Sequence, residues 1–278
     1  MWKHWVVRAC TPFEPFKDFE LARWTWMTLM DNFPDALSAV LMPNHLHIIL
    51  PSSSPDEVHM RRLAGIMGAL SKRIKKKKLW QPIPAPVRIP DDQHLRRQIR
   101  YVSLNPCRKN LCPDPLSWYW STYREVFGAT VERQETAEKL ARIWGVPLGQ
   151  FRVRFHAYVS GDPSVDVKGT PAPGAQVPPG LWAEKPVGEI LAACAAALRV
   201  ETIDVQKVGQ LRNLFVHMAY RHLWREAALL GEICAISPHG VRKILRKPIS
   251  AAQIGAADLC LGDSRLRCGT PPSRLFGK

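Results

Sequence analysis

Alternating apolar and polar positions predict short strands in the first part of the chain. Residues 4–8, 36–42 and 45–50 have the pattern of strands, and 87–89 is a further short extended segment. Pro43 and Asn44 separate the second strand from the third and favour a tight turn. We therefore expect 36–42 and 45–50 to form an antiparallel hairpin.

Helical periodicity predicts helices between and after these strands, at 15–32, from Pro55 to about residue 76, and at 92–104. The resulting order is strand, helix, strand, strand, helix, strand, helix. This order predicts an α+β fold, specifically a ferredoxin-like split βαβ sandwich with an antiparallel sheet covered by helices on one face. The uncovered face would then be free to carry a site.

The second half of the chain has a helical pattern and is expected to be all-α. Helices are predicted at 135–144, 151–159, 187–198, 206–223, 226–234 and 238–246. Residues 161–186 are rich in Pro, Gly and Ala and predict a linker, so we expect residues 1–160 to fold alone. The predicted parts are an α+β domain at 1–128, a helical extension at 129–160, the linker at 161–186, a helix-turn-helix domain at 187–248 and a partly ordered tail at 249–278.

The formal net charge of +15 favours a polyanionic partner, either nucleic acid or an acidic membrane surface. No run of apolar residues is long enough for a membrane span, and the first residues lack a secretory signal, so we expect a cytoplasmic protein without membrane contact. Lys and Arg are concentrated between Arg61 and Lys109, where only Asp91 and Asp92 oppose them. Four consecutive lysines, 75–78, would by themselves indicate a solvated face. Because they lie between two motifs that suggest chemistry, we interpret them as contacts to the phosphate backbone of a nucleic acid.

The first motif is a pair of histidines, His45 and His47, on one predicted strand. Residues two apart leave the same face of a strand, whereas Leu46, Ile48 and Leu50 would point into the core. An isolated pair of this kind is more often an ordinary surface or hydrogen-bonded pair. Imidazole is nevertheless a common ligand of divalent ions, and a nearby third ligand and nucleophile would favour a metal site.

The second motif is a basic helix that carries Tyr101. Asn105 shares a helix face with Tyr101, and Arg97 precedes it by one turn. We expect Pro106 to end the helix at Asn105 and to leave the Asn105 side-chain oxygen free to coordinate. A tyrosine here is usually a packing residue, but its arginine-rich flank favours attack on a phosphodiester beside a metal bound by His45, His47 and Asn105.

Together, residues 42–47 (MPNHLH) and 100–108 (RYVSLNPCR) resemble the HUH single-tyrosine transposases, in the branch of the REP-associated tyrosine transposases. The resemblance covers residues 1 to about 160, and it places the HUH domain at 1–128. The chain departs from the family pattern after Trp80-Gln81, where it has residues 82–86 (PIPAP) in place of a basic-aromatic segment.

The resemblance implies a DNA-strand transferase that cleaves and rejoins hairpin-forming single-stranded DNA from repeat palindromes. It implies Mg²⁺ or Mn²⁺ as cofactor, His45 and His47 as metal ligands, Asn105 as the third ligand, and Tyr101 as the nucleophile that forms a 5′-phosphotyrosine. The basic side chains expected to contact DNA in this part are Lys72, Arg73, Lys75, Lys76, Arg97, Arg100 and Arg108. The choice between monomer and dimer stays open.

Residues 187–247 resemble the DNA-binding domain of the bacterial replication initiator. Residues 229–245 have the pattern of a helix-turn-helix, with Ser237 as the N-cap of the second helix. This module would bind duplex DNA in a major groove, with four side chains outside its core: His239, Arg242, Lys243 and Arg246. A helical hairpin used only for packing is the alternative.

Two further functions are compatible with these patterns. A domesticated regulator would keep the fold and bind repeat elements without cutting them, but intact His45, His47 and Tyr101 favour the enzyme. A metal-dependent RNA-binding or RNA-processing protein would share the basic composition but would give no reason for a tyrosine beside the metal.

Overall fold

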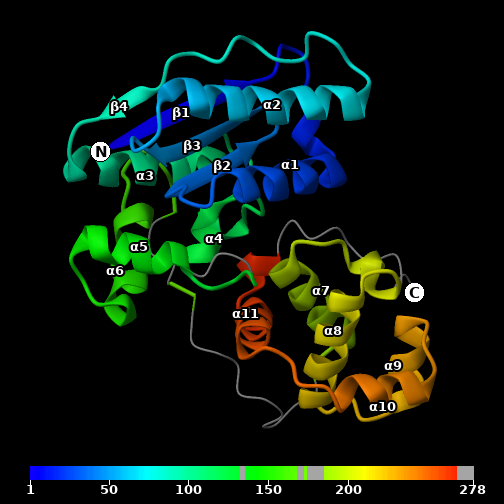
Figure 1. The fold of residues 1–278 in the computed structure, drawn as a ribbon. Helices are drawn as coiled ribbons and strands as arrows, with labels where there is room; N and C mark the ends of the chain where they lie inside the picture. The colour runs from blue at the N-terminus through cyan, green and yellow to red at the C-terminus, as the bar shows by residue number, and fades with distance from the viewer. Residues whose placement is uncertain (132–134, 168–171, 174–184, 268–278) are drawn as a thin grey trace. The chain divides into compact units, whose positions relative to one another are not determined.

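Four strands pair into one antiparallel sheet in this computed structural model, which describes residues 1–131, 135–167, 172–173 and 185–267 (Figure 1). They are β1 (Trp2–Arg8), β2 (Ser38–Met42), β3 (His45–Pro51) and β4 (Val87–Ile89), in the order β2-β3-β1-β4. Met42 of β2 lies opposite His45 of β3, so the predicted hairpin is confirmed.

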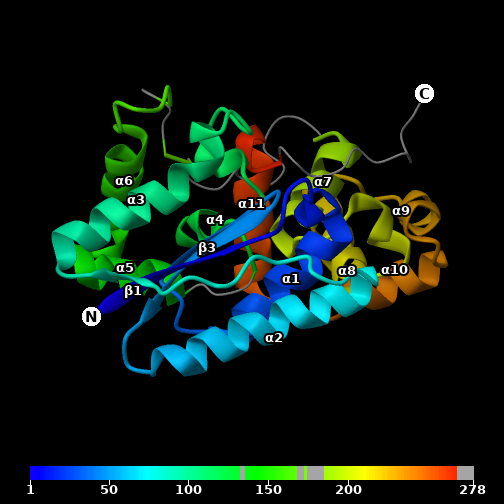
Figure 2. The same ribbon diagram turned by 90° about the horizontal axis from the view of Figure 1, so that it is seen from above.

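Helices cover both faces of this sheet. The 3-10 helix η1 (Pro15–Lys17) leads into α1 (Phe19–Asn32), which packs beside α2 (Asp56–Ile74), while α3 (Asp92–Arg108) lies on the other side of the sheet (Figure 2). The order of strands and helices in the sequence, and the α+β class, are as predicted. Three further helices follow: α4 (Thr122–Val126), α5 (Glu135–Trp144) and α6 (Leu148–Ser160).

The strand register decides which side chains meet which helix layer. Trp5 lies opposite Ile48 in the pairing of β1 with β3, and its ring makes an edge contact with His59 of α2. Arg8 lies opposite His45 on the other face, which α3 covers with buried Ile99 and Val102. The expectation that this face is uncovered was therefore wrong, because α3 also has an apolar side to bury.

Helix α3 is one turn longer than predicted, since it continues through Pro106 to Arg108. Proline lacks an N–H and therefore removes one helical hydrogen bond, yet the helix continues beyond it. Lys109 N–H donates to the carbonyl of Asn105, and Leu111 N–H donates to that of Pro106, so the last turn has hydrogen bonds of its own.

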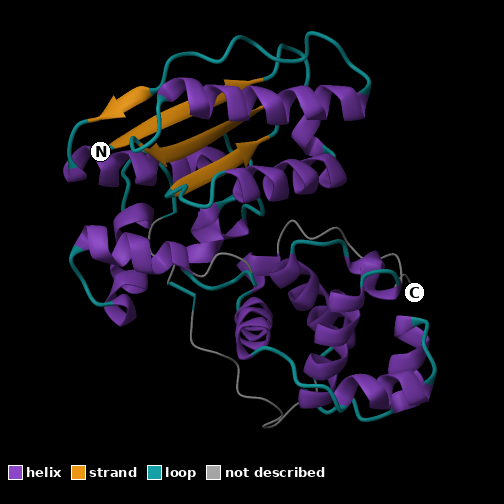
Figure 3. Cartoon of the chain, viewed as in Figure 1, coloured by secondary structure: helices purple, strands orange, loops and turns teal. Residues whose placement is uncertain are grey.

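The second half of the described chain is helical. Figure 3 shows that the strands lie in the first part of the chain. Its elements are α7 (Val187–Leu198), η3 (Thr202–Gln206), α8 (Gly209–Arg221), α9 (Ala227–Cys234), α10 (Pro238–Leu245), α11 (Ala251–Gly262) and η4 (Ser264–Arg267). The predicted partly ordered tail at 249–278 begins with helix α11, while its last residues, 268–278, lie outside the described residues. Helix α11 buries Ala256, Ala257, Cys260 and Leu261, and apolar burial of this extent orders a chain.

The chain divides into two compact units whose limits differ from the predicted domains. The first unit comprises Met1–Pro115, Trp120–Tyr123 and Glu138–Thr170, and the second comprises Leu116–Tyr119, Arg124–Ala137 and Pro171–Lys278. The predicted boundary at 128 and the predicted extension at 129–160 therefore do not coincide with the units. Residues 162–167, expected to begin the linker, bury Asp162 and Val167 in the first unit, and the rest of the predicted linker falls mostly outside the described residues.

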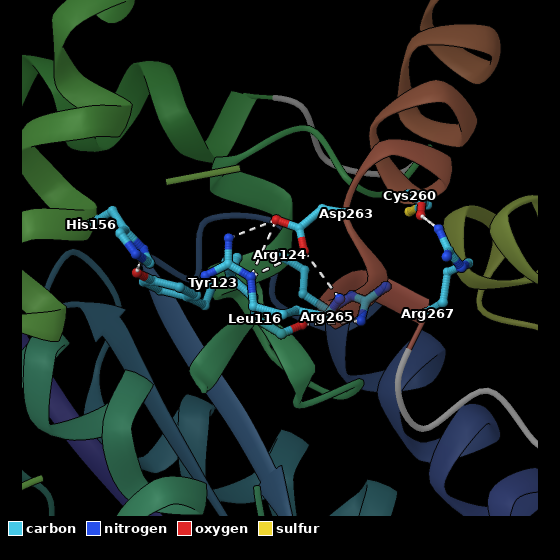
Figure 4. Close-up of polar contacts among 8 residues, drawn as sticks. All are labelled: Leu116, Tyr123, Arg124, His156, Cys260, Asp263, Arg265 and Arg267. Carbon is cyan, nitrogen blue, oxygen red and sulfur yellow. Dashed lines mark hydrogen bonds and ion pairs between the residues drawn. The ribbon is translucent and has the colours of Figure 1, made fainter. Parts of the chain in front are cut away.

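Polar contacts join Leu116–Tyr119 and Arg124–Ala137 to the later residues of the second unit. Arg124 donates to the carbonyl of Leu116 at 3.2 Å (Figure 4). It also donates to the carbonyl of Leu266 at 2.6 Å. Glu125 forms a 3.0 Å ion pair with Arg199, and both side chains are almost fully buried. The sequence missed these pairs because their partners are far apart along the chain. No helix in the described part of the chain is long and apolar enough to cross a membrane.

Candidate functional site

His45 and His47 lie on the face of β3 that α3 covers, and their ring centroids are 4.9 Å apart. Both side chains are buried, at 6% and 4% exposure. Leu46, Ile48 and Leu50 are buried on the opposite face, so the predicted alternation of this strand is confirmed. Strand geometry alone brings the two imidazoles together.

The hydrogen bond of His45 defines which of its nitrogens is available. Its Nδ1 lies 2.7 Å from Oδ1 of Asn44, the turn residue just before β3. An amide oxygen only accepts hydrogen bonds, so His45 Nδ1 carries the proton and donates it. The lone pair of the neutral ring is then on Nε2, which is free to bind a cation.

His47 has a different partner, a third histidine from the neighbouring strand. His4 Nε2 lies 3.0 Å from His47 Nδ1, and the two rings stack with centroids 5.1 Å apart. His4 Nδ1 is in turn 2.9 Å from the side-chain amide nitrogen of Gln98 on α3. Sequence reasoning missed His4 and Gln98 because their place beside His47 depends on the strand register and on where α3 crosses the sheet.

Burial keeps these imidazoles neutral. Desolvation lowers the pKa of His45 to about 4, helped by the nearby positive charges of Arg8 and Lys109. The same cause lowers the pKa of His47 to about 2 and that of His4 to about 4. At neutral pH each ring therefore has one proton and one lone pair.

Tyr101 of α3 faces this histidine cluster from the opposing layer. Its ring centroid is 5.7 Å from that of His47 and 6.3 Å from that of His4. It is 36% exposed, so the buried imidazoles have a solvent-accessible phenol beside them. The Arg108 guanidinium lies 5.0 Å from the centre of the Tyr101 ring, where a cation is attracted to the aromatic face.

Asn105 lies one turn after Tyr101 and is buried. We predicted that the helix ends at Asn105 and thereby frees its side-chain oxygen. That prediction of the helix end was wrong, because α3 continues to Arg108. Its side-chain Nδ2 donates to the carbonyl of Tyr101 at 2.9 Å, which uses the amide nitrogen and leaves the oxygen as the atom that could coordinate.

The predicted DNA-binding arginines of α3 differ in their surroundings. Arg97 is exposed, whereas Arg100 and Arg108 both pair with Asp162, at 3.1 and 2.9 Å. Burial raises the pKa of Asp162, but hydrogen bonds from Ser164 and the two arginine charges outweigh it and keep the pKa below its usual value. The sequence missed Asp162 because we interpreted its segment as a linker.

The basic end of α2 lies at the same end of the sheet as His45. Lys75 caps α2 in a left-handed conformation, and the chain then reaches Trp80, which bridges to Ala9 just after β1. Arg8, the preceding residue of β1, is the strand partner of His45. Two of the basic side chains lie over aromatic rings, Lys76 over Phe13 and Arg73 over Trp24, while Lys72 and Lys75 are exposed.

The other predicted DNA contacts lie in the second unit, on or next to α10. His239, Arg242, Lys243 and Arg246 are all exposed, whereas Val241 is buried. Ser237 caps the helix by accepting a hydrogen bond from Gly240 N–H, as its sequence position predicted.

The donor chemistry of the histidine cluster fits a divalent transition ion such as Mn²⁺. Neutral imidazole nitrogen from His45 and His47, with amide oxygen from Asn105, is a mixed set of the kind that Mn²⁺ accepts, whereas Mg²⁺ favours oxygen. The described residues contain no group of three or more His, Cys, Asp and Glu side chains arranged for a metal, so such a site would rely on the amide and on the substrate for its remaining ligands.

Comparisons with known proteins give a single structural likeness to report. No protein family matches the sequence, and no curated protein matches it. One solved structure is similar, a REP-associated tyrosine transposase bound to a REP hairpin, with 20% sequence identity and a TM-score of 0.38. The likeness covers 44% of this chain and 75% of that chain.

Proposed function

We propose that this chain is a transposase-like DNA-strand transferase that cleaves and rejoins hairpin-forming single-stranded DNA. Tyr101 is the nucleophile, and a divalent metal, Mg²⁺ or Mn²⁺, binds to His45, His47 and Asn105. The observation that carries the proposal is the exposed Tyr101 phenol facing two buried, neutral imidazoles across the sheet–helix interface. A tyrosine that served only for packing would give no reason for two neutral imidazoles, which are groups able to bind a metal, beside its ring.

In the proposed reaction the Tyr101 oxygen attacks the phosphorus of a phosphodiester in line. The bond from phosphorus to the 3′-oxygen breaks, the 3′-hydroxyl leaves with a proton, and the phenol proton passes to solvent. The product is a 5′-phosphotyrosine, and attack by a 3′-hydroxyl reverses the steps and releases the phenol. The metal would supply Lewis acidity at the phosphate oxygens, while the chain's own arginines hold the strand.

The architecture supports the same proposal at a coarser level. The strand order β2-β3-β1-β4, with both helical crossovers, supports the proposal of a ferredoxin-like split βαβ sandwich. Helices α9 and α10, joined by a short turn at Ala235–Ser237, support the proposal of a helix-turn-helix, and the exposed basic residues of α10 suit a duplex groove. We therefore assign duplex DNA binding to the second unit.

The decisive experiment is Tyr101→Phe with a labelled hairpin oligonucleotide. We expect the covalent protein–DNA adduct to disappear while DNA affinity is unchanged, because only the attacking oxygen is lost and phosphate contacts dominate affinity. Tyr220→Phe is the control, since Tyr220 is 38% exposed but lies in the second unit. An adduct that persists in Tyr101→Phe would refute the assignment, and a wild-type protein that binds the hairpin without any adduct would favour a non-cutting regulator.

Removal of metal gives an independent test. Chelation should abolish the adduct and leave binding of the oligonucleotide intact, since the phosphate loses its Lewis acid but keeps its cationic partners. Added Mn²⁺ should restore the adduct. Undiminished cleavage in chelator would exclude the metal mechanism.

A further inference from the structure

A pocket of about 220 Å³ lies within the second unit, between helices α8, α10 and α11. Gln210, Asn213 and His217 line it from one face of α8, and Lys243 and Lys247 line it from the end of α10. The connection from α10 to α11 also contributes to the wall. Pockets for drug-sized molecules begin at roughly 300 Å³, so this one has room for a small ligand.

Positive charge alone lines this pocket in the described chain. Lys243 and Lys247 are exposed and lie one turn apart, and neither has an ion-pair partner among the described residues. Like charges four residues apart destabilise a helix. No carboxylate of the described chain lines the pocket to offset this repulsion, so the pocket favours an anionic ligand.

The neutral groups of the pocket favour a ligand that forms hydrogen bonds beyond its anionic group. Gln210 and Asn213 of α8 and Gln253 of α11 have carboxamides, each of which can both donate and accept. His217 Nε2 donates to the carbonyl of Ile244 at 3.2 Å, which joins α8 to α10 at the pocket. The two lysines can therefore bind a phosphate group while the carboxamides bind the organic part to which it is attached.

The pocket lies beside the side of α10 that we propose for duplex DNA. His239, Arg242 and Arg246 follow one stripe of the helix, at spacings of three and four residues, and none of them lines the pocket. Lys243 belongs both to the pocket and to the proposed DNA contacts. A ligand that contacts Lys243 would occupy one DNA contact and place negative charge beside the others.

We infer that this pocket binds a small phosphate monoester with a hydrogen-bonding organic part, such as a nucleoside monophosphate, and that the bound ligand weakens binding of duplex DNA. A phosphate monoester carries roughly 1.5 to 2 negative charges at pH 7, which match the two ammonium groups, whereas a phosphate of the DNA backbone carries one. The effect on DNA rests on the proposed duplex binding by the second unit. Binding of the monoester itself does not.

Calorimetric titration of the full-length protein with deoxyadenosine 5′-monophosphate, in the absence of DNA, tests the pocket. We expect saturable binding that deoxyadenosine, which lacks the phosphate, does not show. Lys247→Gln should weaken this binding about 10-fold or more, the usual effect of losing one charged partner, and Asn213→Asp should weaken it by repelling the phosphate. Both positions are exposed, so we expect both variants to fold. Lys207→Gln is the matched control, because Lys207 is exposed in the same unit, does not line the pocket, and its replacement changes the net charge equally.

The second measurement is the affinity for a duplex oligonucleotide, by fluorescence anisotropy, with and without the nucleotide. We expect saturating deoxyadenosine monophosphate to weaken duplex binding several-fold in the wild type and in Lys207→Gln, because coupling between two ligands is reciprocal. The same nucleotide concentration should have little effect on Lys247→Gln.

Three results would each overturn the inference: equal nucleotide affinity in Lys247→Gln and Lys207→Gln, binding of deoxyadenosine as tight as that of its monophosphate, or a duplex affinity that saturating nucleotide leaves unchanged. Weaker duplex binding by Lys247→Gln in a protein that binds no nucleotide would also overturn it, since the pocket would then hold a backbone phosphate. A protein that binds the nucleotide as expected but binds no duplex DNA would support the pocket and refute the proposed duplex binding.

Discussion

At the scale of single residues, Asp162 occupies the two arginines, Arg100 and Arg108, that flank Tyr101 and that we propose as DNA contacts. One carboxylate oxygen contacts both Arg100 and Arg108, and the other contacts Ser164, so the group is held in place from two sides. A phosphate group would present the same kind of oxygen to these guanidinium groups. The ion pairs therefore restrain two of the positive charges that a DNA strand would otherwise meet.

Replacing Asp162 by Asn should strengthen binding of single-stranded DNA several-fold. Freed arginines can contact phosphates, so affinity should also fall more steeply with salt, by about 0.7 in logarithmic slope for each added contact. Fluorescence anisotropy across a series of NaCl concentrations measures both effects. Asp166→Asn is the matched control, because Asp166 is exposed and four residues away and its replacement changes the net charge equally. Equal gains in the two variants would show an effect of net charge alone.

The neutral histidines predict how stability changes with pH. In the unfolded chain a histidine takes up a proton near pH 6.5, but in the folded protein His47 does so only near pH 2. The unfolded state thus binds more protons between these values, and the free energy of unfolding should fall as pH decreases below about 6.5. Thermal melts from pH 7.5 to 4 should show this loss, and His47→Gln should make the curve flatter than that of the wild type.

The sequence could predict part of this residue arrangement. The common face of His45 and His47 follows from the two-residue period of one strand, which requires no knowledge of its neighbours. The position of His4 follows from the register of β1 against β3, and Gln98 follows from the path of α3 across the sheet, so neither could be read from local pattern. The roles of Tyr101 and Asn105 stay predictions.

At the scale of elements, most helices and strands follow the periodicity of their own residues, and the misses have local causes. The predicted end of α3 at Asn105 relied on the proline rule, which describes a lost hydrogen bond, whereas the helix has other bonds in its last turn. Helix α11 was missed because small and apolar residues dominate its sequence, which lacks the continuous polar face that marks an amphipathic helix.

The turn between α9 and α10 depends on one glycine. A Cβ at Gly231 would lie 2.6 Å from the carbonyl oxygen of Ile236, a backbone atom that cannot move away without opening the turn. Gly231→Ala should therefore destabilise the second unit by about 1–3 kcal/mol and weaken duplex DNA binding. Thermal melting and a binding assay with duplex DNA measure these effects.

Gly240→Ala is the matched control in the same motif. A Cβ there would meet its nearest neighbours at 3.5 Å, an ordinary contact, and alanine favours a helix over glycine. The variant should be as stable as the wild type or slightly more stable. Equal losses in both variants would show that the close approach at Gly231 has no special importance.

At the scale of the whole molecule, the second unit is built from both early and late parts of the chain. Tyr119 donates to the carbonyl of Ala195, and Val131 N–H donates to that of Ala197. Glu125 has its buried partner in Arg199. The sequence could not predict this division, because long-range pairings leave no local pattern and the composition shift at 161–186 suggested a simple boundary.

This division changes the expectation for a fragment of residues 1–160. Without residues 185–267, Glu125 loses its ion pair with Arg199, and Tyr119 loses the Ala195 carbonyl to which it donates. We expect residues 116–137 of the fragment to be cut readily by protease and the fragment to melt below the first unit of the full chain. A fragment of residues 1–267 should behave as the full chain does. Full protection of 116–137 in the shorter fragment would contradict the discontinuous unit.

The partners of Arg124 also set an order of events during synthesis. All strands of the sheet have been synthesised once β4 has been made. The Leu266 carbonyl that accepts from Arg124, however, lies 142 positions after Arg124 in the chain. At roughly 5–20 residues per second, a ribosome needs about 7–28 s to add this length. A nascent chain therefore carries Arg124 without its Leu266 partner for that time, a period in which a chaperone can bind the incomplete second unit.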